Sequence, residues 1–228
     1  MKNKPNPLWF AVFDCDGTLV DSQQAIVQTM QRACSHHEFP CPAEPDIKRV
    51  IGLPLEVAID RLLKGIDNSL ALDICATYKS AFSDLRQANL VSEPLYAGVA
   101  DVLDQLENDG WVLGIATGKS HRGLRATLKQ HDLMKKFVTH QTADSAFGKP
   151  HPDMILKAMA ASGAEPQHSV MIGDTTFDME MACNAGITGI GVAWGYHEID
   201  ELMDAGAHGV VQNTSDLLRL LRDKMEPP

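Results

Sequence analysis

Residues 8–20 read LWFAVFDCDGTLV. The apolar run over residues 8–13 is typical of a strand buried on both faces, as in a parallel sheet. Two carboxylates follow the strand, Asp14 and Asp16, and their spacing of two points both side chains the same way. Gly17 then lets the chain turn away sharply. Such a pair can share a hard divalent cation while one carboxylate attacks an electrophile, so this stretch predicts a reactive acidic site at a strand end.

Further along the chain, short apolar runs alternate with helix-period stretches. Strands are predicted over residues 111–116, 137–140, 169–172 and 187–193, and helices over residues 98–108, 120–130, 152–162 and 176–184. This alternation predicts parallel strands joined by helical crossovers, an α/β fold of the Rossmann-like class. In open sheets of this kind ligands bind outside the carboxyl ends of the strands. We therefore expect the chemistry at that edge.

One interval is too long for a simple crossover. About a hundred residues separate the first predicted strand from the second, whereas a crossover needs only a dozen or more. Most of the excess has helical patterning, over residues 24–36, 55–63 and 69–87. We predict an α/β core over residues 1–20 and 91–228, with a helical-bundle cap domain inserted over residues 21–90.

Three other segments place reactive side chains at predicted strand ends. They are GIATGKS (114–120), FGKPHPD (147–153) and VMIGDTTFD (170–178). The first sets Thr117 and Gly118 before a helix, an arrangement that binds anions through backbone N–H groups. The second holds Lys149 between a glycine and a proline. The third ends a strand at Asp174 and places Asp178 one helical turn later.

Each of these segments also has an ordinary structural explanation on its own. Thr-Gly turns and acidic residues are common helix caps, and lysines are common on surfaces. Together, in this order, the four segments resemble the motifs of the haloacid dehalogenase-like hydrolase superfamily. The resemblance covers nearly the whole chain. Within the superfamily, the chain is most similar to the phosphoglycolate phosphatase-like and β-phosphoglucomutase-like branch.

The resemblance implies a phosphatase that hydrolyses a small phosphorylated metabolite, phosphoglycolate-like or a sugar phosphate, through an aspartyl-phosphate. Asp14 would attack phosphorus. Asp16 would protonate the leaving oxygen and then deprotonate water. Lys149 would offset the negative charge of the phosphoryl group, and Thr117 with the Gly118 N–H would hold its oxygens.

The same resemblance implies Mg²⁺ as cofactor, which suits a set of oxygen ligands. The expected ligands are the Asp14 carboxylate, the Asp16 backbone carbonyl and Asp174, with Asp178 in support. In the cap, Arg49 is our candidate for contacting the part of the substrate beyond the phosphate. A solvated arginine at a helix end is an equally open interpretation.

Other functions remain open at this stage. A phosphomutase uses the same core motifs and differs only in the acceptor of the phosphoryl group. A non-catalytic phospho-acceptor or binding protein is a third interpretation. Asp16 argues against a dehalogenase, because a halide leaving group needs no acid.

The bulk composition limits the partners. The chain carries 30 acidic against 20 basic residues, a formal charge of -10, which argues against binding nucleic acid or an anionic membrane. Its five cysteines are scattered and form no CxxC pair, which favours reduced thiols and a cytoplasmic location. Residues 1–7 are polar, and the run that follows is too short for a signal peptide. Cys15 is expected to be a buried structural thiol, and monomer and homodimer both remain open.

Overall fold

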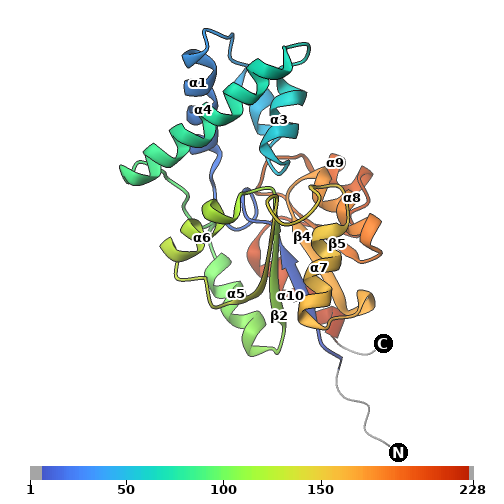
Figure 1. Ribbon diagram of the computed structural model, residues 1–228. Helices are drawn as coiled ribbons and strands as arrows, with labels where there is room; N and C mark the ends of the chain where they lie inside the picture. Colours follow the sequence, from blue (N-terminus) through green and yellow to red (C-terminus); the bar gives the residue numbers. More distant parts are fainter. Residues whose placement is uncertain (1–6, 226–228) are drawn as a thin grey trace, which may run out of the picture.

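The computed structural model describes residues 7–225. Its centre is a sheet of six parallel strands in the order β3-β2-β1-β4-β5-β6. The strands are β1 (Phe10–Phe13), β2 (Val112–Thr117), β3 (Phe137–Thr142), β4 (Ser169–Gly173), β5 (Thr188–Val192) and β6 (Val210–Val211). The predicted parallel α/β fold is therefore confirmed (Figure 1).

Strand β1 lies in the middle of the sheet, where its apolar sequence has the most to gain from burial. Phe10 pairs with Val112 of β2 on one side and with Ser169 of β4 on the other. Ala11 and Phe13 belong to the apolar core on one face of the sheet, and Phe10 and Val12 belong to the core on the other. A strand covered on both faces needs apolar residues at every position, which explains the uninterrupted run.

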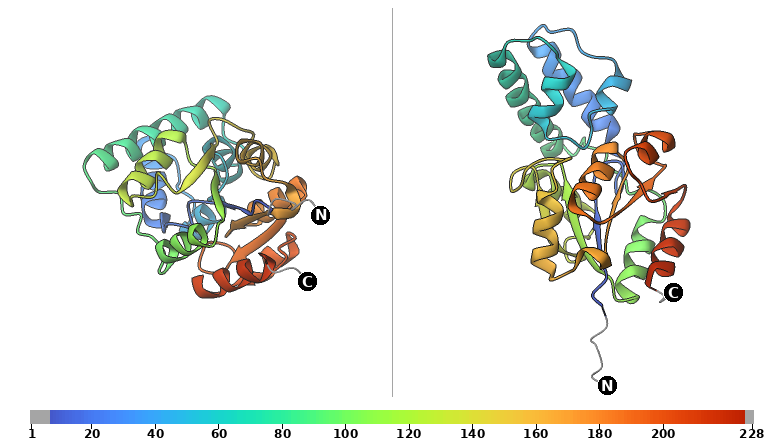
Figure 2. Two further views of the ribbon diagram at one scale, coloured as in Figure 1. Left: turned by 90° about the horizontal axis from the view of Figure 1, so that it is seen from below. Right: turned by 90° about the vertical axis from the view of Figure 1, so that its right-hand side faces the viewer.

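Helices cover both faces. They are α5 (Val99–Asn108), α6 (His121–Gln130), α7 (Asp153–Ser162), α8 (Thr176–Ala185), α9 (Ile199–Asp204) and α10 (Thr214–Met225). α5 and α10 share the core that contains Phe13, whereas α7 and α8 share the core that contains Phe10. In the right-hand view of Figure 2, α7 accordingly lies on one side of the sheet, with α5 and α10 on the other.

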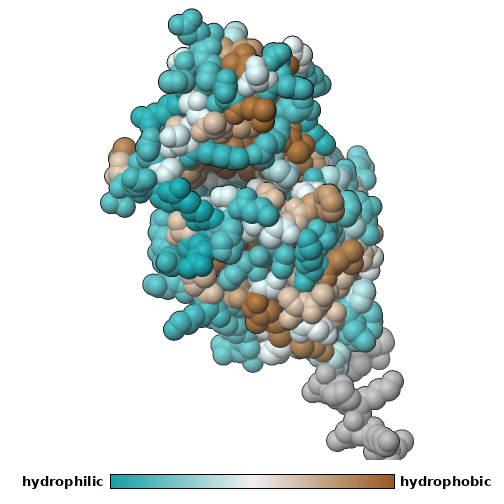
Figure 3. All heavy atoms as spheres, viewed as in Figure 1, coloured by the Kyte–Doolittle hydropathy of each residue, from teal (hydrophilic) through white to brown (hydrophobic). Residues whose placement is uncertain are grey.

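The chain between β1 and α5 forms a layer of helices, above the carboxyl ends of the strands in Figure 1. Its members are α1 (Gln23–His36), α2 (Glu44–Lys48), α3 (Leu55–Leu62) and α4 (Asn68–Gln87). They bury an apolar core of their own, which includes Met30, Ile47, Ile59 and Ile74. We call residues 21–90 the helical layer. Figure 3 shows the molecular surface hollowed between this layer and the sheet.

The predicted elements are present, with ends shifted by at most two residues, as is normal for helix and strand termini. Five elements were not predicted, namely α2, the 3-10 helix Pro166–His168, α9, β6 and α10. β6 has two residues and α2 five, too few for a periodic pattern to be visible. Residues 1–6 and 226–228, which hold most of the polar start of the chain, lie outside the described part. Within residues 7–225 no helix combines the length and the apolar character needed to span a bilayer.

Two residues of α4 test whether the helical layer is held by its own core. Ile74 is fully buried and Leu72 is 64% exposed on the same helix. Ile74→Ala should lower the free energy of unfolding by about 2–5 kcal/mol, since it leaves a cavity. Leu72→Ala should change it by less than about 0.5 kcal/mol. Urea unfolding of both variants measures this, and equal effects would contradict the assigned core.

Candidate active site

Parallel strands bring the acidic segments together. β1 and β4 are neighbours in register, so Asp14 and Asp174 follow adjacent strand ends. Asp178 lies in the first turn of α8. All three residues are fully buried, and one carboxylate oxygen from each lies within 4.8 Å of the other two. The structure thus brings together three of the four predicted metal-binding residues.

Lys149 completes the cluster. Its side chain is fully buried, with Nζ at 2.8 Å from Asp14 Oδ1 and at 2.6 Å from Asp178 Oδ1. Both distances are those of ion pairs, although neither contact has the geometry of a hydrogen bond. A lysine this deep requires charged partners, since burial of an unpaired charge is costly. The structure thus places the predicted Lys149 beside two of the predicted acidic residues.

Burial dominates the electrostatics of the cluster. It raises the pKa of Asp14 to about 7, against the lowering effect of Lys149, and the charge of Asp178 raises it further. Burial also raises the pKa of Asp174 well above its usual range. For Lys149, burial lowers the pKa, but the charges of Asp14 and Asp178 outweigh it and the net shift is upward. Lys149 alone therefore supplies too little positive charge to stabilise all three carboxylates in their ionised form.

A divalent cation would supply that charge. With three ionised carboxylates and one ammonium group, the cluster carries a formal charge of about −2. Among the described residues, neither oxygen of Asp14 has a hydrogen-bond partner, although both are buried. Buried polar atoms without a partner need an explanation. The atoms of this cluster that could bind a metal ion are all carboxylate oxygens. The residues present therefore fit a hard cation such as Mg²⁺.

A second layer of contacts fixes Asp174. Thr18 Oγ1 donates to Asp174 Oδ1 at 2.7 Å, and the Tyr196 backbone N–H donates to Oδ2 at 3.0 Å. A Cβ on Gly17 would lie 2.1 Å from Asp174 Oδ2, so only glycine fits there. The sequence analysis gave Thr18 and Tyr196 no role. Both lie too far from Asp174 along the chain, by 156 and 22 residues, for a local sequence pattern to reveal the contacts.

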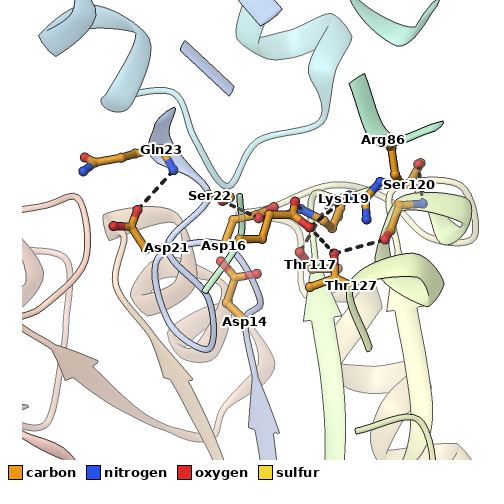
Figure 4. A network of polar contacts seen from close by, with 12 residues as sticks. Asp14, Asp16, Asp21, Ser22, Gln23, Arg86, Thr117, Lys119, Ser120 and Thr127 are labelled. Atoms are coloured by element: carbon orange, nitrogen blue, oxygen red, sulfur yellow. Dashed lines mark hydrogen bonds and ion pairs between the residues drawn. The ribbon is translucent and has the colours of Figure 1, made fainter. Parts of the chain in front are cut away.

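The Asp16 carboxylate is held by residues outside the acidic cluster. Its Oδ1 accepts hydrogen bonds from Ser22 Oγ at 2.5 Å and from Lys119 Nζ at 2.5 Å. Lys119 also pairs with the buried Glu93 at 3.0 Å, and Glu93 pairs with Arg86 of α4 at 2.9 Å (Figure 4). Only its backbone carbonyl was expected to bind metal, and that role stays a prediction.

The charges in this chain of contacts are tuned by one another. For Lys119, burial lowers the pKa, but Asp16 and Glu93 outweigh it and the pKa is raised. For Glu93, burial favours the neutral form, but Lys119 and Arg86 hold the pKa below its usual range. Lys119 and Glu93 are therefore both charged at neutral pH. The sequence analysis assigned no role to Lys119, Glu93 or Arg86.

The Thr117–Gly118 turn lies against the helical layer. Thr117 is buried at the end of β2. A Cβ on Gly118 would lie 2.4 Å from the backbone oxygen of Gly52, between α2 and α3. Pro54 of the same loop approaches the turn that precedes Lys149, because a Cβ on Gly148 would lie 2.2 Å from Pro54 Cγ. The loop therefore lies directly over two of the predicted motif turns.

Arg49 lies elsewhere. Its guanidinium pairs with the Glu201 carboxylate of α9, and both side chains are partly exposed. Arg49 is not among the residues that line the cavity beside Asp16. The structure thus brings it to a contact between the helical layer and the core, and substrate contact by Arg49 stays a prediction.

Cys15 is fully buried. Burial raises the pKa of its thiol well above the usual range, which keeps it protonated and unreactive. This agrees with the expected structural role.

Comparisons with known proteins agree with the geometry. The family model described as haloacid dehalogenase-like hydrolase matches residues 11–192. A Dickeya dadantii protein named "Probable phosphatase IndB" is 35% identical, over 91% of this chain and 90% of its own. A phosphoglycolate phosphatase of Vibrio parahaemolyticus is 27% identical, over 92% of this chain and 94% of its own. The crystal structure of a hydrolase from Pseudomonas syringae superimposes with a TM-score of 0.83 at 29% identity, covering 95% of this chain and 99% of that one.

The chain therefore belongs to the haloacid dehalogenase-like hydrolase family. This confirms the resemblance carried by the four motifs, and with it the prediction of an enzyme.

The pKa of Asp14 predicts how the metal-free protein responds to pH. The folded pKa, about 7, lies above the ordinary value of 3.8, so between these values the folded state holds a proton that the unfolded state has lost. The free energy of unfolding should therefore fall as pH rises from about 4 to about 7. Asp14→Asn cannot titrate, so its stability relative to wild type should grow over this window by at least about 1.4 kcal/mol.

Urea unfolding in the presence of a chelator, at several pH values, measures the difference between the two proteins. A stability difference that stays constant with pH, or that shrinks as pH rises, would show that the pKa of Asp14 is not raised in the folded protein.

Proposed function

We propose that this protein is a Mg²⁺-dependent phosphatase that hydrolyses a small phosphorylated metabolite through an aspartyl-phosphate. The observation that carries the proposal is the buried Asp14 carboxylate, held at 2.8 Å from Lys149 with no hydrogen-bond partner among the described residues. A carboxylate without hydrogen bonds in a dry pocket is poorly solvated and so a better nucleophile. The names of the relatives, phosphatases, support the same class.

In the first step an oxygen of Asp14 forms a bond to phosphorus and the bond from phosphorus to the alcohol oxygen breaks. Lys149 lies beside Asp14 and offsets negative charge as the phosphoryl group arrives. Thr117 and the Gly118 N–H lie at the end of β2, where they would hold phosphoryl oxygens. Catalysis of this kind consists mostly of positioning and charge stabilisation.

Asp16 moves the protons. It gives one to the leaving alcohol oxygen, and in the second step it takes one from the water that hydrolyses the aspartyl-phosphate. Ser22 and Lys119 hold its Oδ1, so Oδ2 is the atom left to carry the proton. The carboxylate thus has a fixed orientation beside the nucleophile.

Mg²⁺ would be held by Asp14, Asp174 and the Asp16 backbone carbonyl, with Asp178 in support. When bound, it neutralises charge on the phosphoryl oxygens and lowers the repulsion between substrate and carboxylates. We further propose that residues 21–90 act as a cap domain on a core of residues 1–20 and 91–228, closing the site through the loop around Gly52. The cytoplasm remains the expected compartment, and the five cysteines are all free.

A phosphomutase of the same family is the alternative. It would pass the phosphoryl group from Asp14 to a sugar hydroxyl. The enclosed site is compatible with either acceptor, so the assay must distinguish release from transfer.

Asp14→Asn should lower phosphate release by about a thousandfold or more, because no covalent intermediate can form. Chelation of Mg²⁺ should abolish release by the wild type, and added Mg²⁺ should restore it. Phosphate release from a panel of phosphate esters, with and without Mg²⁺, measures both effects. Asp101→Asn is the matched control, because Asp101 is an exposed acid of α5, and it should behave as wild type.

Release that survives in Asp14→Asn would exclude the aspartyl-phosphate route. Transfer between sugar hydroxyls without net release would favour the phosphomutase, and no reaction with any ester would leave a binding protein as the remaining interpretation.

A further inference from the structure

A cavity of about 530 Å³ opens beside Asp16, between the helical layer and the core. Its core side is formed by Asp16, the turn of Gly118 to Ser120 and the start of α6, and its other side by α1, α3, α4 and the loop before α3. If Asp16 protonates the leaving oxygen, as proposed above, the alcohol part of the substrate must extend from Asp16 into this space. The side chains that line the cavity therefore indicate which kind of alcohol the site can bind.

The side formed by the helical layer is mostly apolar. It consists chiefly of Ile26, Met30, Ile47, Val50, Leu53 and Leu55. Two aromatic rings one helical turn apart, Tyr78 and Phe82 of α4, also line it. Their centroids are 6.0 Å apart and their planes differ by 34°, so they form a nearly continuous aromatic surface. Planar rings pack well against such a surface.

The cationic side chains of the cavity are mostly neutralised already. Each of three has a carboxylate partner within 3.0 Å: Lys79 with Glu56, Arg86 with Glu93, and Lys119 with both Asp16 and Glu93. Arg122, which is exposed, donates to the Ser83 hydroxyl across the cavity at 2.7 Å. The inner cavity therefore offers little free positive charge to a second anionic group.

These features disfavour small, doubly anionic substrates. The carboxylate of phosphoglycolate, or the second phosphate of pyrophosphate, would lie against apolar side chains and lose solvation without a free cation in return. A hexose carries more free hydroxyls than the ribose of a nucleoside, and more of them would be left unpaired against the same side. The volume lies in the range that binds drug-sized ligands, far more than a two-carbon alcohol fills.

We propose that the alcohol part of the substrate carries an aromatic or heteroaromatic ring, as in a nucleoside monophosphate, and that this ring binds against Tyr78 and Phe82. The inference rests on the proposed phosphatase function and specifies its substrate class. It departs from the phosphoglycolate-like or sugar phosphate substrates that the family resemblance implies.

Two primary alkyl esters that differ only by a ring provide the test. Phenethyl phosphate should have a kcat/KM at least about tenfold above that of ethyl phosphate, equivalent to about 1.4 kcal/mol, because its phenyl ring leaves water for the apolar side. Nucleoside monophosphates should likewise exceed phosphoglycolate, glucose phosphate and pyrophosphate. Phosphate release at saturating Mg²⁺ measures all of these.

Filling the cavity should reduce the preference. Ala126 of α6 lines the cavity, and Ala126→Leu should lower the phenethyl-to-ethyl ratio by at least about threefold, because the added methyl groups occupy the space of the ring. Ala160→Leu on α7 is the matched control, since Ala160 is exposed and outside the cavity, and its ratio should equal that of wild type. The ratio is taken within each variant, so a loss of folded protein does not affect it.

Release from phosphoglycolate, glucose phosphate or pyrophosphate at a kcat/KM equal to or above that of the ring-bearing esters would overturn the inference and leave the phosphatase function standing. A phenethyl-to-ethyl ratio near one, or a ratio unchanged in Ala126→Leu, would overturn it as well. Absence of release from every ester would reject the phosphatase function itself, and the inference with it.

Discussion

The contact of the buried Lys149 with Asp14 and Asp178 is the constraint on which the rest of the site depends. Three carboxylates, two at the ends of adjacent strands and one in the first turn of α8, repel one another, and burial removes the water that would screen them. One ammonium group offsets part of that charge and leaves a cluster that still favours a cation. The parallel sheet makes the arrangement possible, because β1 and β4 are neighbours and end at the same edge.

A loop of the helical layer approaches two turns of the core closely. Gly118 and Gly148 lack side chains where the loop of Gly52 to Pro54 approaches most closely, and a Cβ at either position would collide with it. Burial of the cluster is the main cause of the raised pKa values of Asp14 and Asp174. It also strengthens the electrostatic contacts that phosphoryl transfer requires. The loop thus links the packing of the layer to the chemistry of the core.

Much of the fold and of the acidic cluster could be predicted, because those signals are local. An apolar strand followed by Asp14, or a strand followed by Asp174, is visible within ten residues of sequence. Contacts across the chain have no such signal. Lys119 reaches Asp16 across 103 positions of sequence, and Arg49 pairs with Glu201, 152 positions away. The sequence analysis therefore identified the side chains of the acidic cluster better than the side chains that hold their neighbours in place.

In the proposed mechanism, the ion pairs that orient the Asp16 carboxylate also determine which cations of the cavity are free to bind a substrate. Buried ion pairs add little to stability on balance, because desolvation offsets their attraction, so Lys119, Glu93 and Arg86 are better understood through what they position. Lys119 is engaged by Asp16 and Glu93, and Arg86 by Glu93. The same contacts that fix Asp16 therefore leave neither cation free for a ligand. If the proposed function holds, a cavity whose cations are mostly paired, and whose remaining lining is largely apolar and aromatic, would select an alcohol by its apolar surface.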